Sequence, residues 1–150
     1  MELRGKLWID PGSVGFDDAA GAEIEVVIPY TFAEETRAVM ERAAVLTRGL
    51  NARISLVAVH AIPYASTYGC PTSTHAFLVA RLLELSAVSP LPVSAQVVLA
   101  WSREEGFEHA LKPGSTVLVG SRRHLWRTSE ERLARRLAGA GHKVALIYLG

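Results

Sequence analysis

The sequence predicts an α/β protein whose core is a five-stranded, doubly wound parallel sheet of the Rossmann-like kind. Two observations predict it. Short, β-branched apolar runs alternate with longer amphipathic runs from residue 23 to residue 150. Each amphipathic run can form the right-handed helical crossover that a parallel connection needs, which places helices on both faces of the sheet. We expect the strand order 3-2-1-4-5.

The five expected strands are short, rich in Val, Ile and Leu, and bounded by Pro, Gly or Asn. Such runs are typical of strands that are buried on both faces. They are residues 23–29 (EIEVVIP), 52–60 (ARISLVAVH), 93–100 (VSAQVVLA), 115–120 (STVLVG) and 143–150 (KVALIYLG).

Four helices are expected between these strands, at residues 34–51, 75–87, 103–111 and 131–141. The apolar positions of each recur at helical spacing and predict one buried face. Those faces comprise Val39, Ala43, Leu46 and Leu50 in the first helix, Leu78, Leu82 and Leu85 in the second, Phe107 and Leu111 in the third, and Leu133 and Leu137 in the fourth.

The starts of the last two helices carry a capping signal. Ser102 precedes Glu105 by three residues, and Thr128 precedes Glu131 by the same interval. A hydroxyl at the N-cap accepts a hydrogen bond from the backbone N–H three residues later. Both residues are therefore expected to cap the start of the helix that follows them.

The chain divides into an N-terminal arm, residues 1–22, and one α/β domain, residues 23–150. Gly, Pro and Asp recur through the arm and predict turns rather than a core element, although Leu7, Trp8 and Ile9 are apolar enough to dock on the domain. The roles of the arm and of the long connection Ala61–Thr74 are not predicted from the sequence.

The charge balance, the lack of long apolar runs and the single cysteine exclude several classes of function. Sixteen basic residues nearly balance fifteen acidic ones, so no overall field attracts nucleic acid or acidic lipid. No apolar run has the length of a membrane span or of a secretion signal. Cys70 is the only cysteine, which fits a reducing compartment. These features predict a cytoplasmic protein without nucleic-acid or membrane partners.

A ligand crevice is expected where the strand order reverses, between the first and fourth strands. In doubly wound sheets ligands bind at the carboxyl ends of the strands at this point. Its two sides would be formed by Pro29, Tyr30 and Thr31 and by Gly120–Arg123. A strand followed by Gly-Ser and a capped helix can hold a phosphate through backbone N–H groups and the helix dipole.

The segment TVLVGS, followed after a turn and a helix by GHKVALIYL, resembles the universal stress protein family over residues 23–150. The resemblance implies the sheet described above. Members of the ATP-binding branch carry Gly-x2-Gly-x9-Gly-Ser/Thr after the fourth strand and an Asp after the first. Gly120 and Ser129 match, but Arg123 replaces the second glycine, the loop is shorter, and Pro29-Tyr30-Thr31 lacks the Asp.

The resemblance therefore implies a dimeric regulatory or stress-response protein with a degenerate nucleotide site. An alternative is binding of ATP, AMP or another anion through Gly120–Arg123 and Ser129, with the guanidinium groups of Arg122, Arg123 and Arg127 as a clamp. A third reading is a nucleotide-hydrolysing enzyme, and a fourth is a structural module whose crevice is filled by Tyr30 and Trp126. The candidate nucleotide-binding residues are Tyr30, Thr31, His60, Gly120, Ser121, Arg122 and Ser129.

No residue is predicted to be catalytic, because the sequence has no nucleophile elbow and no phosphate-loop lysine motif. His60, Cys70 and His75 could suggest a zinc site or a thiol–histidine pair. Their spacing matches no closed zinc site, and a fourth ligand is missing. We therefore predict no metal.

The last strand predicts a homodimer. Residues Val144 to Leu149 are apolar on both faces, and the expected strand order places them at the edge of the sheet. An uncovered edge strand offers unpaired backbone groups to another chain. Universal stress proteins pair this strand across a twofold axis, so the resemblance implies the same interface here.

Overall fold

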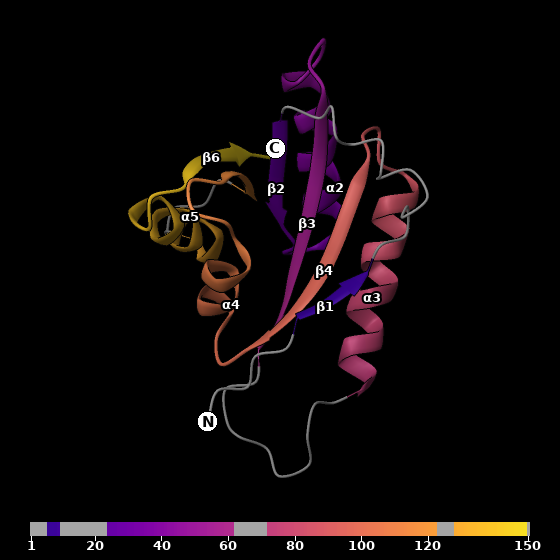
Figure 1. The fold of residues 1–150 in the computed structure, drawn as a ribbon, viewed down its shortest axis with the longest axis vertical. Coiled ribbons are helices and arrows are strands. Elements are labelled where there is room, and N and C mark those ends of the chain that lie inside the picture. The colour runs from indigo at the N-terminus through magenta and orange to yellow at the C-terminus, as the bar shows by residue number, and fades with distance from the viewer. Residues whose placement is uncertain (1–5, 10–23, 62–71, 123–127, 150) are drawn as a thin grey trace.

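The computed structural model describes residues 6–9, 24–61, 72–122 and 128–149, which form one six-stranded sheet with helices on both faces (Figure 1). The strands are β1 (Lys6–Ile9), β2 (Ile24–Pro29), β3 (Ala52–Ala61), β4 (Val93–Ala100), β5 (Thr116–Ser121) and β6 (Lys143–Tyr148). The helices are α2 (Ala33–Leu46), α3 (Thr72–Ala87), α4 (Arg103–Ala110) and α5 (Ser129–Gly139).

The strand order β1-β4-β3-β2-β5-β6 confirms the predicted fold class. The five strands from β2 to β6 are all parallel and stand in the predicted order 3-2-1-4-5. β1 adds a sixth, antiparallel strand on β4, in which Lys6 is paired with Val98 and Ile9 with Ala95. Part of the predicted arm thus extends the sheet, because the outer edge of β4 offers backbone groups for pairing.

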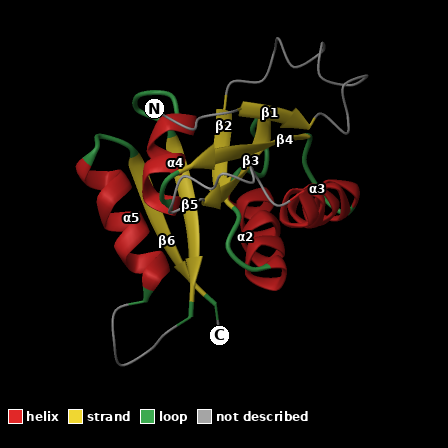
Figure 2. Cartoon of the chain, turned by 90° about the horizontal axis from the view of Figure 1, so that it is seen from below, coloured by secondary structure: helices red, strands yellow, loops and turns green. Residues whose placement is uncertain are grey.

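Figure 2 shows the sheet between two helical layers, with α2 and α3 on one side and α4 and α5 on the other. The α2/α3 side buries a cluster that includes Ile28, Met40, Leu56 and Leu82. The α4/α5 side buries a second cluster around Phe107. Successive residues of each strand serve alternate faces, so almost every central strand position is apolar, as expected for a sheet covered on both sides.

Both predicted helix caps are present. The Ser102 hydroxyl accepts a hydrogen bond from the Glu105 N–H (3.2 Å), and the Thr128 hydroxyl accepts one from the Glu131 N–H (3.1 Å). The first helix is shorter than predicted, because α2 ends at Leu46 and Gly49 turns the chain at φ +83°. Leu46 and Leu50 were expected on the buried face and are instead mainly exposed.

Within the described ranges, no helix has the length and apolar character needed to cross a membrane.

Candidate functional site

The crevice was predicted at the carboxyl end of β2, which pairs with β3 on one side and β5 on the other. The chain leaves β2 through Tyr30 and Thr31 into α2, and it leaves β5 through Ser121 and Arg122 toward α5. The residues that follow β2 and those that follow β5 therefore lie at the same edge of the sheet. The side chains at this edge largely bind one another.

Arg122 is held by the first turn of α2. Its Nε lies 3.2 Å from Glu35 Oε1, and its Nη2 lies 3.8 Å from Glu34 Oε2. The Glu35 side chain is only 12% exposed, whereas that of Glu34 is 92% exposed. The guanidinium that the anion-binding alternative uses as part of a clamp is thus paired with two carboxylates.

Ser121 is fully buried, and its hydroxyl lies 2.8 Å from the Thr128 hydroxyl. The Ser121 hydroxyl also donates to the carbonyl oxygen of Arg122 (3.2 Å). Thr128 uses the same hydroxyl oxygen to cap α5. This short chain of hydrogen bonds ties the end of β5 to the start of α5 and engages the hydroxyl that was a candidate ligand contact.

Ser129 begins α5 and is exposed. Its hydroxyl donates to Glu130 Oε1 (3.0 Å), and its carbonyl oxygen accepts a hydrogen bond from Arg103 Nη2 (2.9 Å). Arg103 also lies 3.9 Å from the buried carboxylate of Glu130. The start of α5 thus carries its own acidic group, which satisfies the positive end of the helix dipole.

Gly120 lies where α2 packs closely against β5. A Cβ atom at Gly120 would lie 2.5 Å from Val39 Cγ2 and 3.1 Å from Leu149 Cδ1. Its backbone φ is not positive, so conformation does not require glycine here. α2 lies so close to β5 at this point that only glycine fits, whatever the loop binds.

Tyr30 and Thr31 are both half-buried. Tyr30 packs against the α2/α3 core, and its N–H donates to the Val57 carbonyl (2.7 Å). Burial raises the pKa of the Tyr30 phenol above its usual 10.0, although the nearby Arg81 opposes this. The Thr31 N–H donates to the Thr36 hydroxyl (3.2 Å). Both residues help to fix the turn into α2.

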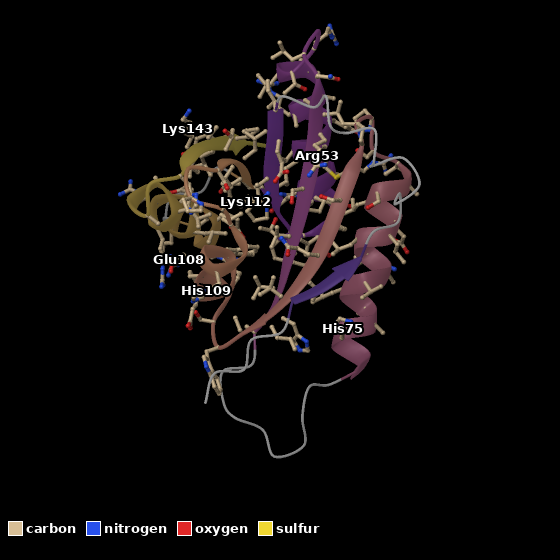
Figure 3. All side chains as sticks on the ribbon, viewed as in Figure 1. Arg53, His75, Glu108, His109, Lys112 and Lys143 are labelled. Atoms are coloured by element: carbon tan, nitrogen blue, oxygen red, sulfur yellow. The ribbon has the colours of Figure 1, made fainter. Side chains whose placement is uncertain are left out.

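His60 lies at the end of β3 with His75 of α3 nearby, rather than with the Arg122 group. His60 is 6% exposed, and burial lowers the pKa of its imidazole below 6.5, with His75 adding to the shift. Figure 3 labels His75 on α3. In the described residues no three His, Cys, Asp or Glu side chains gather as a metal site, and Cys70 lies outside those residues.

The remaining members of the proposed clamp, Arg123 and Arg127, lie outside the described residues, as does Trp126. Sequence reasoning missed Glu34 and Glu35 as the partners of Arg122. The signal was available, since Glu34 and Glu35 begin the helix expected after the first strand, and the start of that helix lies at the same edge of the sheet as the residues after the fourth strand.

Comparison with solved structures finds the fold in a universal stress protein from Archaeoglobus fulgidus. The alignment has a TM-score of 0.52 and 12% sequence identity, and covers 89% of this chain and 99% of that chain. This chain has the universal stress protein fold. The fold resemblance expected from the last two strands is therefore confirmed. No protein-family model matches the chain, and a search of the curated proteins finds no match.

Proposed function

We propose that this universal-stress-protein-like chain is a regulatory, non-catalytic protein that does not hold ATP in the manner of the family's ATP-binding branch. The pairing of Arg122 with Glu35 and Glu34 is the observation that supports this most directly. The hydrogen bond between Ser121 and Thr128 supports it further. Arg122 and Ser121, which a phosphate would contact, are thus already bound by side chains of the chain itself.

The carboxylates paired with Arg122 also disfavour the binding of a phosphate. The Arg122 guanidinium and its two carboxylate partners, Glu34 and Glu35, sum to a formal charge of −1, and Arg123 and Arg127 lie outside the described residues. Two like charges 4 Å apart repel by about 1 kcal/mol in water and about 4 kcal/mol at an effective dielectric constant near 20. A phosphate approaching Arg122 would have to displace or approach these carboxylates. The alternative reading, an anion site or a hydrolase centred on Arg122, would require them to move away.

The test is nucleotide binding by the purified full chain. We expect neither ATP nor AMP, each with Mg²⁺, to raise the thermal midpoint, because only a ligand that prefers the folded state stabilises it. Native mass spectrometry should find no co-purified nucleotide, and no phosphate should be released from ATP. A midpoint that rises with ATP in the parent and not in Arg122→Ala would instead establish the anion-binding alternative.

A double variant asks whether the carboxylates are the cause. Glu34→Gln with Glu35→Gln removes both negative charges and keeps the side-chain shapes. If self-pairing is what excludes anions, this variant should gain a response to inorganic phosphate or AMP that the parent lacks. Glu104→Gln with Glu105→Gln, in the first turn of α4, is the matched control with the same change in net charge.

We also propose that the chain forms a homodimer through β6. β6 stands at the end of the strand order, and Ala145 and Tyr148 are exposed on it. Edge strands with apolar side chains favour pairing with another chain. Ala145→Lys with Tyr148→Lys should convert the dimer to a monomer in size-exclusion chromatography with light scattering. Leu83→Lys, an exposed apolar position on α3, is the control that should leave the mass unchanged.

A cytoplasmic location stays a prediction that rests on the single Cys70.

A further inference from the structure

A patch of polar side chains lies on the α4/α5 face of the sheet, near the amino ends of β2, β3 and β4. Glu25 is beside Arg53, and Ser55 is beside Ser94, in the strand register. Gln96 lies two residues beyond Ser94 and so faces the same side. Sheets covered on both faces are usually apolar at such positions, so the patch calls for an explanation.

The length of α4 explains why this part of the sheet is not covered by a helix. α4 has 8 residues and ends at Ala110, whereas α3 on the other face has 16. At a rise of about 1.5 Å per residue, α4 spans about 12 Å and α3 about 24 Å. Beyond α4 the chain turns through Lys112–Ser115, where the Ser115 N–H donates to the Lys112 carbonyl (3.2 Å).

A cavity of about 70 Å³ lies between this turn and the sheet. Its lining includes the polar residues Glu25, Arg53, Ser55, Ser94, Gln96, Lys112 and Ser115. A neighbouring groove of about 390 Å³ shares Glu25, Val27, Lys112 and Ser115 with it, so the cavity has an open approach from solvent. The inner part alone has room for about two water molecules at about 30 Å³ each.

Gln96 is the member that points to a ligand. It is only 4% exposed, and its buried Oε1 has no hydrogen-bond partner in the part of the chain that the structure describes. A buried acceptor without a partner costs about 1–3 kcal/mol. Ser55, also buried at 8% exposed, faces the same cavity. The Gln96 Oε1 acceptor would be satisfied by a polar molecule that enters from the groove.

The charges around the cavity define the chemistry of that molecule. Arg53 Nη2 and Nε donate to Glu25 Oε2 at 2.9 and 3.3 Å, so these two charges compensate one another. The exposed Lys112 adds one positive charge at the mouth. Figure 3 labels Arg53 on β3 and Lys112 on the segment that follows α4. The cavity thus offers a net positive charge and hydroxyl donors to an acid group, while Gln96 Oε1 needs a donor.

We propose that this cavity binds a small carboxylate that carries a hydroxyl or ammonium group next to the acid. The carboxylate lies toward Lys112 and the serine hydroxyls, and the hydroxyl or ammonium donates to Gln96 Oε1. The site is at the amino ends of the strands, opposite the crevice at Arg122, and does not depend on the proposed function.

The probes are L-serine and L-lactate, titrated to 50 mM into the full chain at constant ionic strength, with acetate as the carboxylate that lacks the donor. At twenty times the dissociation constant, one-site binding should raise the thermal midpoint by about 4–7 °C. Acetate should give a smaller rise. If neither L-serine nor L-lactate raises the midpoint, or if acetate is as effective as both, the proposal is wrong.

Two variants locate the effect. Gln96→Leu should abolish the response and leave the midpoint of the unliganded protein unchanged or higher, because it removes an unpartnered buried amide. Lys112→Gln should weaken binding about two- to fivefold, as for an exposed ion pair, whereas Arg48→Gln, an exposed cation outside the cavity, should leave it unchanged. A Gln96→Leu variant that still responds like the parent, or that loses stability without ligand, would overturn the proposal.

Discussion

Replacing Gly120 by alanine tests whether the glycine at the family motif is required for packing. The new Cβ would lie 2.5 Å from Val39 Cγ2, well inside van der Waals contact, and Val39 is a β-branched side chain, stiff at χ1, that is only 1% exposed. The contact with Leu149 Cδ1 at 3.1 Å is easier to relieve, because it involves the end of a flexible side chain. The strain therefore falls mainly on the contact between α2 and β5.

The expected loss follows from two opposing effects. Overpacking a closed site costs about 1–3 kcal/mol. Alanine recovers about 0.5–1 kcal/mol relative to glycine inside a strand, because the unfolded chain is less free. The free energy of unfolding should thus fall by about 1–2 kcal/mol. For a domain of this size the thermal midpoint should fall by about 2–8 °C.

The assay is urea unfolding at equilibrium, with Gly139→Ala as the matched control. A Cβ at Gly139 meets no atom within 4 Å, so the control should be neutral or stabilising, by up to about 1 kcal/mol. In a Val39→Ala background, Gly120→Ala should cost less than about 0.5 kcal/mol, because the coupling of two contacting residues is about 0.5–3 kcal/mol. An equal cost in both backgrounds would refute the packing explanation.

Thr128→Ala should lower the free energy of unfolding in urea by about 2 kcal/mol, because it removes the cap of α5 and a partner of buried Ser121. A loss of unfolding free energy no larger than that of Ser102→Ala would contradict this. Arg122→Ala should cost less than about 1 kcal/mol, because its side chain is 57% exposed. For His60, the folded pKa lies below 6.5, so the unfolded chain binds more protons and stability should fall as pH drops through 6.5. The fall in thermal midpoint from pH 7.5 to 5.5 should be smaller in His60→Gln, and an equal fall would refute this.

Most of the fold could be predicted from the sequence because local and global signals agree. The alternation of β-branched runs with helical spacing predicts each element, and the parallel crossovers then restrict the order of strands. The predictions that were wrong concern where a single helix ends. Leu46 and Leu50 keep helical spacing past the end of α2, but Gly49 at φ +83° stops the helix before the pattern does. Periodicity alone does not show where a helix ends.

The candidate site was predicted less completely because ion pairs between elements have no local signature. The sequence placed Arg122 at the right edge of the sheet, but its pairing with Glu35 depends on how closely α2 approaches β5. The sequence also contained a signal for the polar patch on the α4/α5 face of the sheet, and this signal was not used. Ser94 and Gln96 alternate with apolar residues in a strand that should be apolar on both faces.

The two ends of the sheet therefore differ in how their polar groups are satisfied, and α4 is the reason. At the carboxyl edge the first turn of α2 and the N-cap of α5 place carboxylate and hydroxyl groups against Arg122 and Ser121, so these two side chains are already paired. At the amino edge α4 ends too early to cover β3 and β4, and Gln96 is left without a partner in the described residues. A doubly wound sheet normally binds ligands at its carboxyl edge. Here a ligand gains more at the opposite edge, so any small molecule that stabilises this chain should lose its effect in Gln96→Leu and retain it in Arg122→Ala.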